Sequence, residues 1–125
     1  MNKLIIALTL VAPSLAFADK NYEEGKGDTW DCKDDPVVNI NHGGGTYTFT
    51  GDCSTINING GANKISIASV DSLNIFAGNN TITVGSVGTI NITGAGNRVT
   101  WKHAKEGDAP DITDTGEGNH VGQKK

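Results

Sequence analysis

The side chains that could perform chemistry are few, and they stand at turns. Asp52 and Asp71 fall at neighbouring corners of a repeated sequence, and two carboxylates held together can act as general acid and base. His42 precedes Gly43–Gly45, a run that lacks the Lys-Ser/Thr pair of a phosphate-binding loop. Solvated turn residues explain all of these positions more simply. We therefore predict no catalytic residue, no cofactor and no metal ligand, and we expect that the protein is not an enzyme.

Acidic residues near the C-terminus recur at every third position. An extended left-handed chain has three residues per turn and would align them on one side, where carboxylates could collect Ca²⁺ weakly. A solvated acidic tail is the simpler interpretation, as it is for the acidic run within residues 23–35. The alternative left open is a weakly calcium-dependent or enzymatic module that uses the acidic termini and the turn aspartates. The aligned residues are Asp108, Asp111, Asp114, Glu117 and His120.

A 17-residue repeat from Val38 to Trp101 must position the turn residues His42, Asp52 and Asp71. Within each unit aliphatic residues alternate with polar ones, as in a strand with one buried face, and Gly/Asn-rich turns separate the strands. A fixed short period favours coils stacked on one another over an antiparallel sandwich of hairpins. We predict an all-β fold, a short parallel β-solenoid of about four coils. Shared positions are Ile56, Leu73 and Ile90; Ile58, Ile75 and Ile92; and the turn residues Asn63, Asn80 and Asn97.

The ends of the chain lack this periodicity. Residues 1–18 combine Lys3, an apolar run and the small residues of Ala16-Phe17-Ala18, as a signal peptide does. We therefore expect export to the periplasm or secretion. Residues 19–36 are interpreted as an acidic segment and cap, residues 37–102 as the solenoid and residues 103–125 as a disordered tail. Trp101 is expected to cover the last coil.

Two cysteines, Cys32 and Cys53, lie in the exported part of the chain. An even number of cysteines in an oxidising compartment predicts a disulfide. In register, Cys53 takes the inward position of Val70, so Cys32 must reach it from the preceding segment. Trp30 and Pro36 complete the predicted disulfide-pinned cap at the N-terminal end.

Outward positions form polar columns that could bind a partner. Asn57, Asn74 and Asn91 occupy one column, and Phe76 is the exposed aromatic of the next. Stacked amides also stabilise a solenoid by hydrogen bonding along it, so the column has a purely structural explanation too. We name Phe76, Asn57, Asn74 and Asn91 as the candidate binding surface.

The turn and strand motif resembles a known bacterial family. Gly60-Gly61-Ala62-Asn63-Lys64-Ile65-Ser66-Ile67 and Gly94-Ala95-Gly96-Asn97-Arg98-Val99-Thr100-Trp101 are similar to the family called domain of unknown function 3060. The resemblance covers about residues 37–101. It implies a small exported β-rich domain and assigns no activity to any residue.

The charge balance restricts the partners that we expect. The formal net charge is −4, which disfavours nucleic acid and anionic membranes because affinity for both comes from clusters of Lys and Arg. We expect no membrane insertion once the signal is removed. The sequence predicts a non-enzymatic structural or binding solenoid of the cell envelope, with an envelope protein or a glycan as partner.

Overall fold

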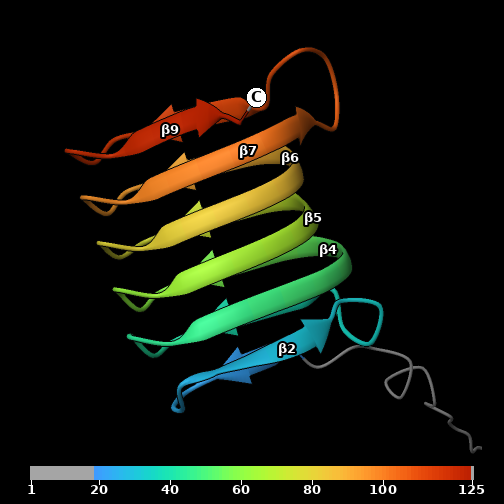
Figure 1. Ribbon diagram of the computed structural model, residues 1–125, viewed down its shortest axis with the longest axis vertical. Coiled ribbons are helices and arrows are strands. Elements are labelled where there is room, and N and C mark those ends of the chain that lie inside the picture. The colour runs from blue at the N-terminus through green and yellow to red at the C-terminus, as the bar shows by residue number, and fades with distance from the viewer. Residues whose placement is uncertain (1–18, 125) are drawn as a thin grey trace, which may run out of the picture.

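The described chain consists of strands that all pair in parallel. A computed structural model describes residues 19–124, so the predicted signal peptide, residues 1–18, lies outside the described residues. The strands stack along one direction, coil upon coil (Figure 1). The predicted fold class, a parallel β-solenoid, is confirmed. The strands are β1 (Lys20–Tyr22), β2 (Gly27–Asp31), β3 (Val37–Ile40), β4 (Thr46–Ile58), β5 (Lys64–Ile75), β6 (Thr81–Ile92), β7 (Arg98–Ala104), β8 (Asp111–Asp114) and β9 (His120–Gln123).

Each long strand serves two sheets, because it turns a corner near its middle. The first half of β4 pairs with β2, and its second half pairs with β3. The corner coincides with a shift of register between Phe49 and Asp52. We call the sheet of β2, the first halves of β4 to β6, β7 and β9 the front sheet, which Figure 1 shows toward the viewer. The back sheet contains β1, β3, the second halves of β4 to β6, and β8.

The core lies between these sheets and is built from the predicted inward columns. Leu73 pairs with Ile56 on one side and with Ile90 on the other, and all three are fully buried. Alternate side chains point out, so each strand contributes to the core and to the surface. Equivalent residues stack at the strand spacing of about 4.8 Å. Cys53 pairs with Val70 and is buried, as the register predicts.

A ladder of asparagines, buried except at Asn119, links the turns at one end of consecutive coils. We call Asn63, Asn80, Asn97 and Asn119 the asparagine spine. The backbone N–H of Asn63 donates to the Asn80 Oδ1 at 2.9 Å, and that of Asn80 to the Asn97 Oδ1 at 2.9 Å. The N–H of Asn97 donates to the Asn119 Oδ1 at 2.8 Å. Side chains that satisfy buried backbone groups in this way are costly to lose.

The residue before each spine asparagine has a left-handed backbone. This conformation turns the chain so that the asparagine side chain points back under the preceding coil. Glycine adopts it freely, whereas a residue with a Cβ is strained there by roughly 1–2 kcal/mol. The positions are Ala62 (φ 59°), Asn79 (φ 62°), Gly96 (φ 72°) and Gly118 (φ 71°).

The prediction of a disordered tail from residue 103 is wrong for residues 103–124. β8 pairs with β6 and β9 pairs with β7, so the tail forms one more coil. Thr115-Gly116-Glu117-Gly118-Asn119-His120-Val121 repeats Thr93-Gly94-Ala95-Gly96-Asn97-Arg98-Val99, but at a separation of 22 residues. Strand pairing and the Asn119 side chain supply the backbone partners that a weakly apolar tail needs in order to fold.

This last coil also corrects two smaller expectations. The acidic residues of the tail do not lie on one side: Asp111 pairs with Thr89, Asp114 continues the inward column of Ile92, and His120 lies on the front sheet. Trp101 is buried in its predicted column, but β9 stacks on it, so it does not end the solenoid.

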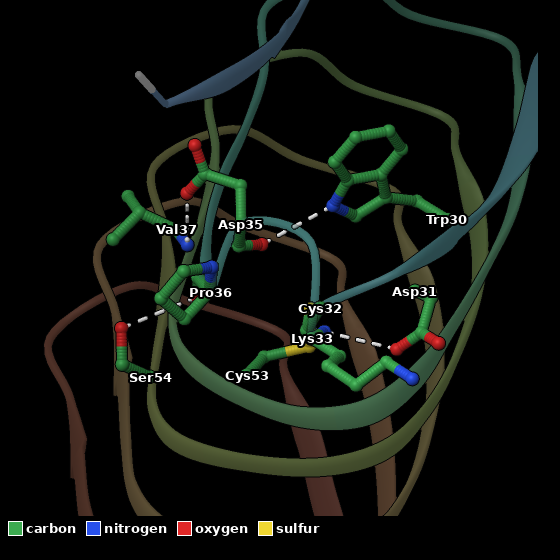
Figure 2. The surroundings of a disulfide bond; sticks show 9 residues. All are labelled: Trp30, Asp31, Cys32, Lys33, Asp35, Pro36, Val37, Cys53 and Ser54. Carbon is green, nitrogen blue, oxygen red and sulfur yellow. Dashed lines mark hydrogen bonds between the residues drawn. A yellow bond between two sulfur atoms is a disulfide. The ribbon is translucent and has the colours of Figure 1, made fainter. Parts of the chain in front are cut away.

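The N-terminal segment forms a further coil, so the described solenoid has about six coils instead of four. β1 pairs with β3, and β2 pairs with β4. The predicted disulfide joins Cys32 to Cys53, with a Cα–Cα distance of 5.0 Å. Figure 2 shows the cap around it, where the Trp30 Nε1 donates to the Asp35 carbonyl oxygen at 3.2 Å. Closing a loop of this length contributes roughly 3 kcal/mol in the chain-entropy picture.

Aromatic rings and one lysine cover the N-terminal end of the core. The Lys20 ammonium lies 5.1 Å from the centre of the Tyr22 ring and 4.6 Å from that of Trp30. The Tyr22 hydroxyl donates to the Asp28 carboxylate at 2.8 Å. Burial, followed by the Asp28 hydrogen bond, raises the pKa of the Tyr22 hydroxyl well above its usual value. The charged lysine and Asp28 protect this edge from further strand pairing.

Replacing Asn80 by alanine should destabilise the protein more than the same change at Asn74 in the same coil. Asn80→Ala leaves the buried N–H of Asn63 without its acceptor, and we expect the free energy of unfolding to fall by about 1–3 kcal/mol. Asn74 is half-buried, so water can replace its partners and the loss should stay below about 1 kcal/mol. Urea unfolding followed by circular dichroism measures both; equal losses would rule out burial as the cause.

Ending the chain after Lys102 should also destabilise it, because β8 and β9 cover part of the core. Uncovering Ile90 and Val99 should lower the free energy of unfolding by about 2 kcal/mol or more. A chain that ends after Gln123 keeps both strands and serves as the control. A disordered tail would make the two truncated proteins equally stable in urea.

Candidate functional site

The candidate binding residues lie together on the outward face of the back sheet. We call this surface the asparagine face and define it by Asn57, Asn74, Asn91 and Phe76. The Asn74 Nδ2 donates to the Asn57 Oδ1 at 2.9 Å, and the Asn91 Nδ2 to the Asn74 Oδ1 at 2.9 Å. The ladder extends through Asn39 to Asn21 with bonds of 2.8 Å. The predicted column therefore exists, and its role in binding stays a prediction.

The ladder leaves at least half of each amide of Asn57, Asn74 and Asn91 free. A side-chain amide has two N–H groups and two acceptor lone pairs. Within the column, Asn74 uses one N–H toward Asn57 and one lone pair toward Asn91. The remaining N–H and lone pair repeat at the strand spacing of about 4.8 Å. Because the ladder holds each amide in one orientation, a ligand meets donors and acceptors that are already ordered.

Phe76 stands beside this ladder and is 55% exposed. Its backbone N–H donates to the Ile58 carbonyl oxygen at 2.9 Å, which fixes its position just after β5. The outward column of Phe76 also contains a short amide ladder, in which the Asn59 Nδ2 donates to the Asn41 Oδ1 at 2.7 Å. Phe76 is the next residue in this column after Asn59, so the ladder stops there. An exposed ring next to ordered amides can stack on an apolar surface while the amides form hydrogen bonds.

A hollow of about 700 Å³ adjoins the asparagine face at the corner of the coils. The chain between β7 and β8 projects from the end of the stack at this corner (Figure 1). The Lys105 Nζ lies 2.7 Å from the Asp71 Oδ1, so an ion pair ties this connection to a coil two turns away. Ser72 and Thr89 add hydroxyls from the back sheet. The volume lies within the range of small-molecule sites.

Sequence reasoning missed this hollow for a clear reason. Lys105 and Asp71 are 34 residues apart, and the connection at residues 105–110 is the insertion that breaks the period. The partial repeat of Gly94-Ala95-Gly96-Asn97 as Gly116-Glu117-Gly118-Asn119 is the signal that could have revealed it. If the two copies form equivalent turns in neighbouring coils, the extra residues between them must form a loop that projects from the stack.

Two further carboxylates, those of Glu106 and Asp111, line the hollow. Within residues 19–124, no group of three or more His, Cys, Asp or Glu side chains is arranged to hold a metal ion. The structure does not pair the turn aspartates: the register sets Asp52 opposite Ser69, while Asp71 contacts Lys105. Carboxylates, one ammonium group and two hydroxyls therefore lie together at this corner.

The comparisons with known proteins agree with the motif. A sequence family described as "Protein of unknown function (DUF3060)" matches residues 77–118, which confirms the predicted resemblance to this family. The match contains the second of the two motifs, at residues 94–101, and begins later than the predicted start at residue 37. The matched stretch contains seven of the nine residues that line the hollow. No curated protein and no solved structure matches the chain. In the described part of the chain, no helix has the length and hydropathy needed to cross a membrane.

Asp71→Asn should loosen the connection over the hollow without unfolding the protein. The ion pair is solvent-exposed, so the free energy of unfolding should change by less than about 1 kcal/mol. Hydrogen exchange of peptides that contain residues 105–110 should become faster, because local opening no longer breaks this contact. Asp52→Asn removes the same charge from a neighbouring corner and should leave that exchange unchanged. Equal exchange in both variants would contradict a tethering role for Lys105.

Proposed function

We propose that this chain, which shares its repeat with proteins of unknown function (DUF3060), is an exported, non-enzymatic binding solenoid of the bacterial cell envelope. Its partner is an envelope protein or a glycan, and the asparagine face is the surface that binds it. The observation that carries the proposal is Phe76, a ring exposed beside an ordered amide ladder.

The chemistry of this face supports binding. Large exposed rings near the centre of a polar patch are the residues from which binding energy usually comes. Each amide of the ladder offers one N–H and one lone pair in a fixed orientation, so little conformational entropy is lost when a partner binds. The hollow at the corner lies next to Ser72 and Thr89, in the outward column beside the ladder. A partner on the face can therefore also enter the hollow.

Two features support export. Residues 1–18 have the charged start, apolar run and small residues of a signal peptide. The disulfide between Cys32 and Cys53 is compatible with an oxidising compartment outside the cytoplasm. Both cysteines are buried, which protects the bond from exchange with other thiols.

Phe76→Ala should weaken capture of the partner from an envelope extract at least tenfold, the effect of losing about 1.4 kcal/mol at a central contact. The exposed ring contributes little to the core, so the melting temperature should change by only a degree or two. Thr93→Ala, one coil along in the same outward column, is the control and should retain capture. Quantitative mass spectrometry of the captured material measures the ratio.

Equal capture by Phe76→Ala and the native chain would exclude the asparagine face as the binding surface. The competing calcium-dependent interpretation predicts a higher melting temperature in Ca²⁺ than in EDTA. We expect the two melting curves to coincide, and a shift toward higher temperature in Ca²⁺ would favour the competing function.

A further inference from the structure

The outward face of the front sheet has a different chemistry from the asparagine face. We call it the basic face. One of its columns alternates hydroxyls with cations along the stack, because Lys64 pairs with Thr46 and Thr81, and Arg98 pairs with Thr81 and His120. The adjacent column consists of the hydroxyl residues Thr29, Thr48, Ser66, Thr83 and Thr100.

Positive charge gathers on this face although the whole chain is acidic. The formal net charge is −4, yet the outward positions of the front sheet carry Lys64, Arg98 and Lys102. Among the outward positions of the described front-sheet strands, one residue is acidic: Asp31, at the N-terminal edge. Lys64, Arg98 and Lys102 are exposed, and in the described chain none of them forms an ion pair.

The hydroxyls and cations of this face have no side-chain partner among residues 19–124, whereas the Asp31 Oδ1 at its edge accepts a hydrogen bond from the Lys33 N–H. The Thr48, Ser66 and Thr83 hydroxyls form no side-chain hydrogen bond with another described residue, in contrast to the amides of the asparagine face. Stabilisation of the stack therefore does not explain this column, as it could explain the asparagines. Free hydroxyls and unpaired cations on a rigid sheet are available to a ligand.

Two shallow hollows lie on the basic face, each beside a cation. One, of about 310 Å³, extends from Thr48 across Ala68 and Gly85 to Lys102. The other, of about 230 Å³, lies between Arg98 and His120. A Cβ added at Gly85 would lie 2.5 Å from the Ala68 carbonyl oxygen, so the close stacking leaves no room for a side chain there. Ala68 and Gly85, with small or no side chains, thus leave the hollow open beside the hydroxyl column.

We propose that the basic face binds an acidic polysaccharide with a carboxylate on alternate sugars, lying along the stack. Lys64 and Arg98 are two coils apart in one column, which is roughly 9–10 Å at the strand spacing. Thr81 lies between them and can bond to the neutral sugar. Each cation then meets one carboxylate, and the hydroxyl column meets the sugar hydroxyls. The proposal concerns the opposite face from Phe76 and is independent of the function proposed above.

The charge spacing favours this ligand over a nucleic acid. A nucleic acid strand carries one phosphate per about 3.4 Å, and tight binding comes from neutralising many of them. Three cations spread over several coils neutralise too few. In a polymer with widely spaced carboxylates, each carboxylate can pair with one cation. The hydroxyls of the polymer can then form hydrogen bonds with Thr48, Ser66 and Thr83.

The test is calorimetric titration of the folded chain with hyaluronan oligosaccharides, whose carboxylates occur on alternate sugars, at low salt. We expect measurable binding that weakens as NaCl is added, because exposed charges are screened. The double variant Lys64→Gln/Arg98→Gln should bind at least tenfold more weakly. Lys26→Gln/Lys33→Gln removes the same charge from the exposed chain on either side of β2, outside the strands of the basic face, and should bind as the native chain does. Circular dichroism verifies that both variants are folded.

Each other outcome is decisive. No binding to hyaluronan, or equal loss in the two double variants, would overturn the proposal. Tighter binding to single-stranded DNA or polyphosphate than to hyaluronan would assign the face to phosphate polymers and would overturn it too. Neutral dextran should not bind. Phe76→Ala should bind hyaluronan normally, so failure of the function proposed for the asparagine face leaves this test unaffected.

Discussion

The structure depends on one repeated hydrogen bond, from the backbone N–H of one turn to the side-chain oxygen of the next asparagine. Asn63, Asn80, Asn97 and Asn119 make this contact from coil to coil, starting from the Gly45 N–H, which donates to the Asn63 Oδ1 at 2.8 Å. A side chain of this length reaches its partner only when consecutive turns stack at the strand spacing. The left-handed residue before each asparagine is the conformational cost of that contact, and the buried hydrogen bond offsets it. The spine therefore fixes the turn, the stacking and the register of the strands on both sides.

Because core and spine hold the backbone, the outward positions are free to differ between the two sheets. On the back sheet they are amides that bond to one another, and on the front sheet they are hydroxyls and cations without protein partners. The solenoid thus carries two chemically distinct surfaces, whose side chains recur at regular intervals along the stack. A repeating surface suits a repeating or extended partner. The edges are protected differently: Lys20 and Asp28 lie at the N-terminal end, and Asp114 continues an inward column at the other.

The period in the sequence was sufficient for the central coils because stacked inward positions tolerate only apolar residues. Ile56, Leu73 and Ile90 revealed the core, and the same register placed Cys53 beside Val70. It was insufficient at the ends, where the terminal coils have few apolar residues and the C-terminal separation lengthens to 22. The low content of apolar residues in the tail predicted disorder, whereas strand pairing and the hydrogen bonds of Asn119 hold the tail in an ordered coil. The candidate asparagine face could be predicted from alternation alone, but the hollow beside it could not, since Lys105 and Asp71 meet only through the insertion.

The sequence by itself determined the class of fold, the disulfide and the side chains that point outward, because alternation and a constant period are local properties of a strand. Tertiary structure decided how many coils there are, which asparagines are buried and which are exposed, and whether neighbouring polar groups bond to each other. Asn80 and Asn74 illustrate the difference. Both recur with the same period, yet one is enclosed by the turns of adjacent coils and the other lies half-buried on a sheet face. Only the stacking of coils distinguishes their environments, since burial is a property of the neighbours that a residue acquires on folding.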